Sequence, residues 1–317
     1  MQFVVGYPGS GTTWIRAVIA AYALDDVSPS DFMAADEENG PLAKHLWSDI
    51  VNHHYQSSTP FALKSLGLSE EVRLRPGAMM LLKRSVSRAP GRNLALIHSH
   101  HAHCSVNGIH MWNGEWTTRV VNPIRDPREI CCSLAARLNT SYAEAAEFMA
   151  NTEAQFPPEE NSEQEANDGE IESSAGHGET ESSSGHGEEK GPEALLHHLL
   201  LSWSNHIRSW FQPENIPVLS VRYEDLCEDP TEAFHKILNF IGVEDVDEDQ
   251  LSTAVETVRF DQMREAEEAH GFPEKLDGEK YFFRSGQSDG WKDELPSDVT
   301  RQIEDDHEEM MRAVGYL

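Results

Sequence analysis

The sequence predicts an α/β fold, with a doubly wound parallel sheet flanked by helices in a single domain. Short apolar runs, each followed by a turn or a charged segment, are typical of the buried strands of such a sheet. Longer segments with helical spacing alternate with these runs, as they do where crossover helices connect parallel strands. The chain of 317 residues is long enough for one large domain with a substantial core.

The expected elements follow from these two patterns, in order along the chain. The apolar runs predict strands at residues 3–6, 94–98, 119–122 and 218–221. Segments with helical spacing predict helices at residues 13–22, 127–138, 142–149, 194–211, 230–241, 248–258 and 298–314. Residues 194–203 are the most apolar stretch, but polar side chains interrupt them, so they predict a buried helix rather than a membrane span.

Residues 151–192 follow neither pattern. They are rich in Glu, Ser, Gly and Asn, and a nine-residue unit at 172–180 recurs in nearly the same form at 181–189. Such a composition cannot bury enough apolar surface to order itself. We therefore expect a low-complexity, acidic and disordered insertion between two helices of a domain that spans residues 1–317.

The chain is strongly acidic, with a formal net charge of −30 at pH 7. This charge disfavours nucleic acids and anionic membranes as partners, because both bind to patches of Lys and Arg. An anionic ligand would have to be bound by a local cluster of cations. A solubility adaptation to salty surroundings is the simpler explanation of the acidic surface.

Other features predict a cytoplasmic protein without a bound metal. The chain opens with no leader of the signal-peptide type, and no window approaches the ~18 apolar residues of a membrane span. The four cysteines form no Cys-x-x-Cys pattern and predict free thiols in a reducing compartment. Histidines crowd residues 98–103, but their spacing fits no common zinc pattern.

A glycine-rich turn, Gly-Tyr-Pro-Gly-Ser-Gly-Thr-Thr at residues 6–13, stands between the first expected strand and the first expected helix. Such a turn leaves the N–H groups of residues 10–13 free at a helix N-terminus, where the helix dipole favours an anion. The spacing fits the P-loop pattern, except that Thr12 replaces its lysine. Nucleoside triphosphatases use that lysine on the γ-phosphate, so its loss favours another phosphate-like ligand. An ordinary Gly/Pro turn is the alternative.

The loop resembles that of the sulfotransferases that use 3′-phosphoadenosine 5′-phosphosulfate (PAPS). Their loop reads Tyr-Pro-Lys-Ser-Gly-Thr-Thr-Trp, and residues 7–14 differ from it only where Gly9 replaces the lysine, which touches the transferring sulfuryl group in the family. The resemblance implies a P-loop-like fold whose loop holds the 5′-phosphate and sulfate through Gly9, Ser10, Gly11, Thr12 and Thr13. The family's tryptophan packs on the adenine, which assigns that role to Trp14; a core position is the plainer interpretation.

Three further segments resemble the nucleotide-binding parts of this family. Arg125 and Ser133 have the separation of the Arg and Ser that grip the 3′-phosphate, a group that suits charge-assisted hydrogen bonds. Residues 283–292 resemble the segment that closes over the same phosphate, with Ser replacing a Lys. This resemblance implies contacts from Phe283, Arg284, Ser285 and Gly286. Tyr223, in a Tyr-Glu-Asp-Leu run after a strand, and Phe260, in a Phe-x-x-Met pair, are implied to lie near the adenine.

The family also supplies a candidate general base. A hydroxyl that accepts a sulfuryl group must lose its proton, and a histidine suits that role near neutral pH. The family has Lys-Thr-His where this chain has residues 98–100, so the resemblance makes His100 the base and puts His98 in place of a second lysine. Candidates to replace the missing positive charges are Arg16, Lys64, Lys83, Arg84 and a protonated His98.

The sequence therefore predicts a sulfotransferase that moves a sulfuryl group from PAPS to a hydroxyl on a small molecule or carbohydrate. Residues 25–90 are expected to carry acceptor specificity, with Phe32, Trp47 and Tyr55 as lining or equally as core. Two alternatives stay open. One is a nucleotide-binding protein of the same fold with weak or no turnover, which Gly9 favours. The other is a P-loop kinase of a small substrate, which Thr12 disfavours.

Overall fold

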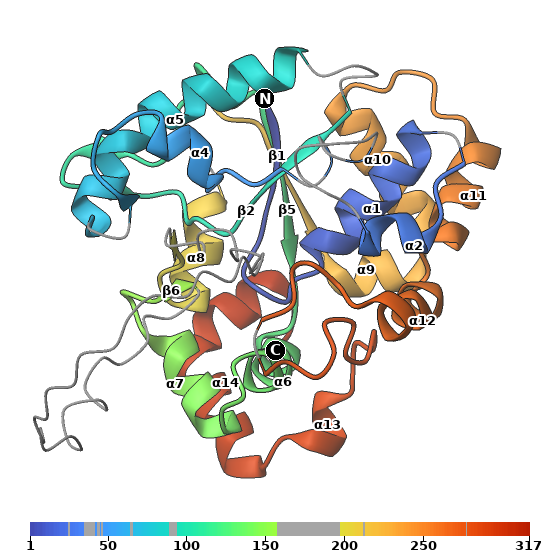
Figure 1. Cartoon of the computed structure of the whole chain (residues 1–317). Coiled ribbons are helices and arrows are strands. Elements are labelled where there is room, and N and C mark those ends of the chain that lie inside the picture. The colour runs from blue at the N-terminus through green and yellow to red at the C-terminus, as the bar shows by residue number, and fades with distance from the viewer. Residues whose placement is uncertain are drawn as a thin grey trace, which may run out of the picture.

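The fold is built around one parallel sheet (Figure 1). The computed structural model describes residues 1–24, 26–34, 42, 45, 47–63, 66–88, 94–156, 197–211, 213–276 and 278–317. The sheet contains β1 (Gln2–Val5), β2 (Leu96–Ser99), β5 (Arg119–Ile124) and β8 (Val218–Arg222) in the spatial order β2-β1-β5-β8, all parallel. Short antiparallel pairs are β3 (Ser105–Val106) with β4 (Ile109–His110), and β6 (Gln155–Phe156) with β7 (His198–Leu199). The predicted α/β fold is confirmed, because the four apolar runs form the parallel strands.

Helices connect and cover these strands. Along the described chain they are α1 (Thr12–Ala23), α2 (Pro29–Met33), α4 (Asn52–Gln56), α5 (Leu68–Arg88), α6 (Pro127–Arg137), α7 (Tyr142–Ala150), α8 (Trp203–Trp210), α9 (Tyr223–Glu228), α10 (Pro230–Ile241), α11 (Glu248–Thr257), α12 (Phe260–His270), α13 (Trp291–Glu294) and α14 (Ser297–Val314). Six of the seven predicted helices are confirmed to within one residue at each end. In Figure 1, α1, α10 and α11 lie on one side of the strands, and α4, α5 and α8 lie on the other.

The sheet is buried on both faces because the side chains of each strand alternate between two hydrophobic clusters. On β1, the central Val4 packs with α1, α10 and α11, whereas Phe3 and Val5 pack on the opposite face with α5 and Trp112. All three β1 side chains are completely buried. A third cluster joins α6, α7, α8 and α14 below the carboxyl ends of the strands.

The predicted helix at 194–211 is wrong over the described residues that precede α8. His198 and Leu199 form β7 against β6, and Leu201 has a left-handed φ of +62°, which no α-helix accepts. The helix begins only at Trp203, because the Ser202 side chain accepts a hydrogen bond from the Asn205 N–H and caps it. Among the described residues of this run, residues 198–200 are buried as predicted, but they precede the helix instead of forming it.

Residue 151, the predicted start of the insertion, is too early. Asn151 ends α7, Ala154 is buried, and Phe156 pairs with His198 in β6 and β7. The ordered fold therefore extends through Phe156. Residues 157–192 of the expected insertion lie outside the described residues.

The sequence did not predict the long helix α5, because charged and Ser side chains interrupt its apolar residues and Pro76 lies within it. It is nevertheless fixed to the core by Val72, Met79 and Leu82 and by one buried ion pair. Arg75 is 1% exposed, and its Nη2 donates to Oδ2 of Asp49 (2.6 Å). No helix in the described ranges combines the length and apolar character needed to cross a membrane.

We predict that Arg75→Met strongly destabilises the fold, because it leaves the buried carboxylate of Asp49 unpaired. Breaking a buried ion pair from one side costs about 3–5 kcal/mol. Urea unfolding at pH 7 measures the change in the free energy of unfolding. The control, Arg208→Met in an exposed pair with Glu309, should change it by about 0–1 kcal/mol; equal effects from the two variants would contradict the role of the buried pair.

Candidate active site

The loop between β1 and α1 lies at the carboxyl edge of the sheet and requires glycine at two positions. Gly9 and Gly11 have φ angles of +87° and +94°, in the left-handed region. A Cβ atom on Gly11 would lie 2.7 Å from Cδ2 of Tyr223, the first residue after β8. The loop is therefore pressed against the end of another strand. The first turn of α1 follows at once, and its leading N–H groups have no partner within the helix.

One cavity opens at this edge and brings together the predicted residues. Its lining includes Gly9, Gly11, Thr12, Thr13, Trp14, His100, Arg125, Ser133, Tyr223, Phe260, Phe283, Arg284, Ser285 and Gly286. Ser10 lies apart from this set: its side chain is completely buried and its N–H donates to Tyr7 O (3.0 Å). The N–H groups expected to be free at residues 10–13 therefore exclude that of Ser10.

A buried carboxylate gathers two arginines at one end of the cavity. Glu129 of α6 is completely buried, and its oxygens lie 3.5 Å from Arg125 Nη2 and 3.6 Å from Arg284 Nη2. Burial raises the pKa of Glu129, against the lowering effects of its hydrogen bond from Trp291 N–H and of the two arginines. Arg125 also donates to the carbonyls of Gly9 (2.9 Å) and Gln287 (2.7 Å), so one guanidinium joins the glycine loop to the C-terminal segment.

Aromatic side chains line the adjoining part of the cavity. The ring of Trp14 lies 5.9 Å from that of Tyr223, and the Arg125 guanidinium lies 4.2 Å above the Tyr223 ring. Gly286 has a left-handed φ of +64°, and a Cβ there would lie 2.5 Å from the ring of Phe260. This wall provides flat apolar surfaces next to the two arginines.

His100 also lines the cavity and is fixed as one neutral tautomer. Its Nδ1 lies 2.5 Å from the carbonyl oxygen of Gly6. Because a carbonyl can only accept, Nδ1 carries the hydrogen and Nε2 keeps its lone pair. Burial lowers the pKa of His100 well below its usual value, with smaller contributions from His198 and Arg137. The imidazole is therefore an unprotonated base at neutral pH.

His98 does not carry the missing positive charge in this structure. Burial, followed by the charge of Arg16, lowers its pKa well below the usual value, so the ring is neutral at pH 7. Its Nε2 lies 3.3 Å from the hydroxyl of Thr12. The neutral ring does not support the hypothesis of a protonated His98, and His98 is a polar neighbour of the loop.

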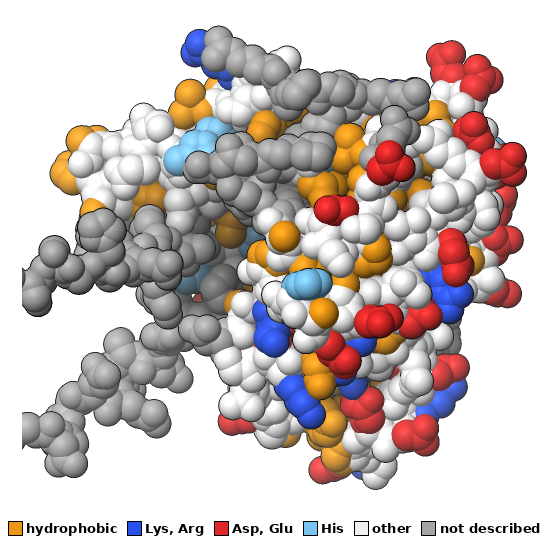
Figure 2. Space-filling view, turned by 45° about the vertical axis from the view of Figure 1, so that its right-hand side comes forward, with side chains coloured by type: hydrophobic (Ala, Val, Ile, Leu, Met, Phe, Trp, Pro, Cys, Tyr) orange, Lys and Arg blue, Asp and Glu red, His pale blue; other side chains and the backbone are white. Residues whose placement is uncertain are grey.

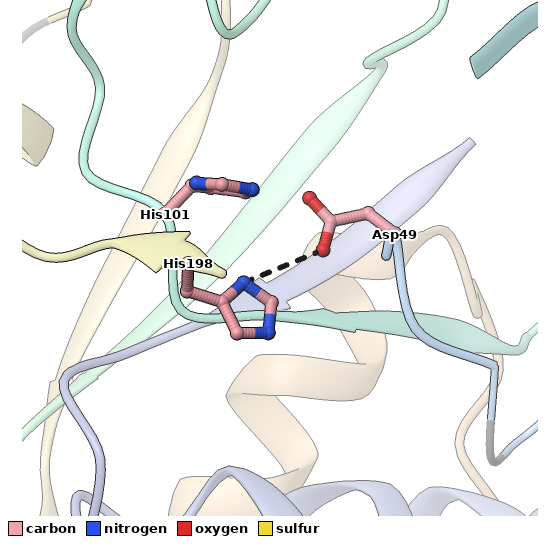
Figure 3. A group of neighbouring side chains, drawn as sticks. All are labelled: Asp49, His101 and His198. Carbon is pink, nitrogen blue, oxygen red and sulfur yellow. Dashed lines mark ion pairs between the residues drawn. The ribbon is translucent and has the colours of Figure 1, made fainter. Parts of the chain in front are cut away.

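A buried group beside His100 consists of Asp49, His101 and His198, whose nitrogen and oxygen atoms approach within 4.8 Å of one another (Figure 3). The Nδ1 atoms accept backbone N–H groups, from Leu199 to His101 (2.9 Å) and from His100 to His198 (3.2 Å). A neutral imidazole has one lone pair, so neither ring has one left for a metal ion in this arrangement. Burial lowers the pKa of His198 to about 3, so its 3.8 Å contact with Asp49 is not ionic at neutral pH. The group fixes the backbone of His100.

The remaining residues proposed to replace the missing positive charges are Arg16, Lys64, Lys83 and Arg84. Arg16 is ion-paired with Glu274, which also accepts from the Thr13 hydroxyl (3.1 Å). Lys83 donates to the carbonyl of Glu115, and Arg84 is exposed on α5. Neither side chain lines the cavity. Lys64 lies outside the described residues. Sequence reasoning missed Arg137, which lines the cavity four residues after Ser133. The helical spacing of these two residues was the signal that could have identified it.

The aromatic residues proposed for acceptor binding have other places. Phe32 belongs to the hydrophobic cluster around α1, and Trp47 and Tyr55 pack in the cluster around α5. None of the three lines the cavity. Phe156 contacts His100 (ring centres 5.8 Å apart), and Phe282, Glu274 and Glu279 line the cavity. The further aromatic and acidic lining of the cavity therefore comes from the C-terminal half of the chain, and Phe156 of β6 contacts His100.

Many of the acidic side chains lie on the surface of the molecule. Figure 2 shows Asp and Glu side chains spread over much of one face of the molecule, with Lys and Arg side chains at fewer, separate places. Arg125, Arg137 and Arg284, in contrast, line the cavity. The local cluster of cations that an anionic ligand would need is therefore present inside an acidic protein.

Comparisons with known proteins agree with this arrangement. A family model described as "Sulfotransferase domain" matches residues 2–315. Sulfotransferase 1A1 of Canis lupus familiaris is 28% identical over 119 residues, 36% of this chain and 40% of that protein. Sulfotransferase 1B1 of Mus musculus is 30% identical over 108 residues, 32% of this chain and 36% of that protein. The alignments cover less than half of either relative.

Solved structures share the fold. Mouse sulfotransferase SULT7A1, complexed with PAP, is 18% identical with a TM-score of 0.54, over 98% of this chain and 84% of that chain. Retinol dehydratase, in a complex with retinol and PAP, is 17% identical with a TM-score of 0.55, over 98% of this chain and 80% of that chain. At these identities the likeness concerns the fold.

We predict that Gly11→Ala disrupts the loop, because the new methyl group meets Tyr223 and the residue keeps a left-handed φ. Backbone strain and overpacking together cost about 2–4 kcal/mol. Gly278→Ala is the matched control, since Gly278 has a φ of +83° with nothing within 4 Å of an added Cβ. Thermal unfolding compares the two variants. Equal losses of stability would show that the contact with Tyr223 does not constrain the loop.

Proposed function

The chain belongs to the sulfotransferase domain family, and from this premise we propose that it transfers a sulfuryl group from PAPS to a hydroxyl on a small molecule or carbohydrate. The observation that carries the proposal is a single cavity that joins a glycine loop at a helix N-terminus, a pair of arginines and a neutral histidine. These are an anion site, a second anion site and a proton acceptor.

The residues present fit the charges and the flat ring of PAPS. Gly9 to Thr13 would hold the 5′-phosphosulfate, while Arg125, Ser133 and Arg284 would hold the 3′-phosphate. Nε and Nη2 of Arg284 are buried and find no hydrogen-bond acceptor within the described residues, so they can donate to a ligand. The adenine would be enclosed by Trp14, Tyr223 and Phe260. The backbone packs closely against two of these rings, because a Cβ atom on Gly11 would meet Tyr223 and one on Gly286 would meet Phe260.

His100 is the proposed general base. When bound, PAPS supplies an activated sulfuryl group that an oxygen nucleophile can accept. The hydrogen bond from Nδ1 to Gly6 directs the free lone pair of Nε2 outward for the acceptor's proton. Because burial lowers the pKa of His100, the base stays unprotonated as the pH falls through the usual histidine range, and protonation would remove activity only at lower pH.

A nucleotide-binding protein of the same fold without turnover is the second candidate. Gly9 and the neutral His98 favour it, since neither supplies a positive charge beside the loop. A kinase is disfavoured by Thr12 in place of the P-loop lysine. The four cysteines are all free thiols, which supports a reducing compartment such as the cytoplasm for either candidate.

We predict that the protein binds 3′-phosphoadenosine 5′-phosphate (PAP) more tightly than adenosine 5′-phosphate. Charge-assisted contacts of about 1.5–3 kcal/mol to the 3′-phosphate correspond to at least about tenfold. Calorimetry with both ligands measures the preference. Arg125→Ala should reduce it, whereas Arg312→Ala, in an exposed pair on α14, should leave it unchanged. Equal affinity for the two nucleotides in the unmodified protein would exclude the PAPS assignment.

We predict that His100→Ala lowers the rate of sulfuryl transfer by about 10²–10⁴-fold with nearly unchanged affinity for PAP. The acceptor proton loses its recipient, while the phosphate contacts lie elsewhere in the cavity. Transfer assays and calorimetry on the same preparation separate the two effects. His98→Ala is the comparison. Near-normal turnover in His100→Ala together with an inactive His98→Ala would show that His100 is not the base.

A further inference from the structure

Arg137, the last residue of α6, lines the same cavity as the glycine loop and His100. It follows Ser133 by four residues, so the two side chains leave α6 on the same face. Ser133 abuts the loop, because a Cβ atom on Gly9 would lie 3.3 Å from the Cβ of Ser133. Arg137 is therefore one helical turn further along the wall that adjoins the loop.

The guanidinium of Arg137 lies between two aromatic rings near His100. Its central carbon is 5.2 Å from the ring centre of Phe156 and 4.9 Å from that of Phe282. Phe156 also contacts His100, with ring centres 5.8 Å apart. Nη2 donates to the backbone oxygen of Glu274 (3.0 Å), whereas Nε has no hydrogen-bond acceptor in the described part of the chain. The guanidinium therefore retains a donor for a ligand.

The charge of Arg137 acts on both cavity histidines. It contributes to the lowered pKa of His98 and of His100, after the larger effect of burial. Burial also lowers the pKa of Arg137, but a guanidinium stays protonated at neutral pH. Because the effect of a charge falls with distance, these two influences agree with a cation at the histidine end of the cavity.

The other arginines that line the cavity are paired with carboxylates. Arg125 and Arg284 are ion-paired with Glu129, and Arg284 also with Glu294 (2.7 Å). For Arg137, no carboxylate of the described residues lies within ion-pair distance; Glu279 and Glu274 influence its pKa from further away. Within the described lining it is the guanidinium available on the side of His100.

We propose that Arg137 is a catalytic residue that binds the transferring sulfuryl group between the loop and His100. This inference rests on the proposed function and deepens it. In the transfer, the bond between sulfur and the phosphate oxygen breaks and leaves its electron pair on that oxygen. The acceptor oxygen forms the new bond to sulfur and gives its proton to Nε2 of His100. A fixed guanidinium stabilises the negative charge that grows on these oxygens.

The test compares the affinities for PAPS and PAP, since only PAPS carries the sulfuryl group. Arg137→Gln should weaken PAPS binding by about tenfold or more, as expected for the loss of a charge-assisted contact, and PAP binding by less than about threefold. Arg137→Met keeps the apolar stem between Phe156 and Phe282 and should give the same result if the glutamine variant folds poorly. Arg137→Lys keeps the charge and should retain most of the preference. Arg312→Gln, which removes one exposed positive charge on α14, is the control and should change neither affinity.

Equal losses of affinity for PAPS and PAP would show that Arg137 only supports the cavity wall, and unchanged affinities for both would show that it touches neither ligand. Either result overturns this inference while leaving the proposed function intact. If the unmodified protein binds neither ligand, the proposed function itself fails. The rate of transfer should fall by about 10²–10³-fold in Arg137→Gln, as when one preorganised donor to a reacting oxyanion is removed.

Discussion

The parallel register of four strands is the constraint on which the site depends. Because β2, β1, β5 and β8 run in the same direction, their carboxyl ends meet at one edge of the sheet. β1 is followed by the glycine loop, β2 by His100, β5 by Arg125 and β8 by Tyr223. Residues separated by more than two hundred positions in the sequence thus line one cavity. Reversal of any one strand would remove its contribution from this edge.

Buried ion pairs fix the orientation of the side chains that follow these strands. Glu129 of α6 brings together Arg125, which follows β5, and Arg284 of the C-terminal segment. Arg125 also donates to the carbonyls of Gly9 and Gln287 and so joins the loop to that segment. On the other side, Asp49 binds Arg75 and accepts from the hydroxyl of Ser99, next to His100. Low accessibility strengthens these interactions and makes an unpaired partner costly. The cavity is therefore preorganised for anions, although the chain as a whole carries a net charge of −30.

The sequence was sufficient for the strands of the parallel sheet, for six of the thirteen described helices and for most residues of the candidate site. Strands buried on both faces and helices begun by Asp-Pro pairs leave strong local signals, as at Asp126 and Asp229. The extended chain at 198–202 was missed because its apolar composition suits a helix, and only the pairing of β7 with β6 and the turn at Leu201 exclude one. The tautomer of His100, the neutral state of His98 and the position of Arg137 depend on burial and on neighbours distant in sequence. No local pattern encodes those.

Transfer of label from sulfur-labelled PAPS to a library of hydroxyl acceptors tests the central claim most directly. The account predicts labelled product with at least one small-molecule or carbohydrate acceptor, formed in equal amount with PAP and lost when His100 is replaced. A protein that binds PAP tightly yet transfers no label to any acceptor, at any pH at which it stays folded, would contradict the account. That result would identify a nucleotide-binding protein built on the sulfotransferase fold.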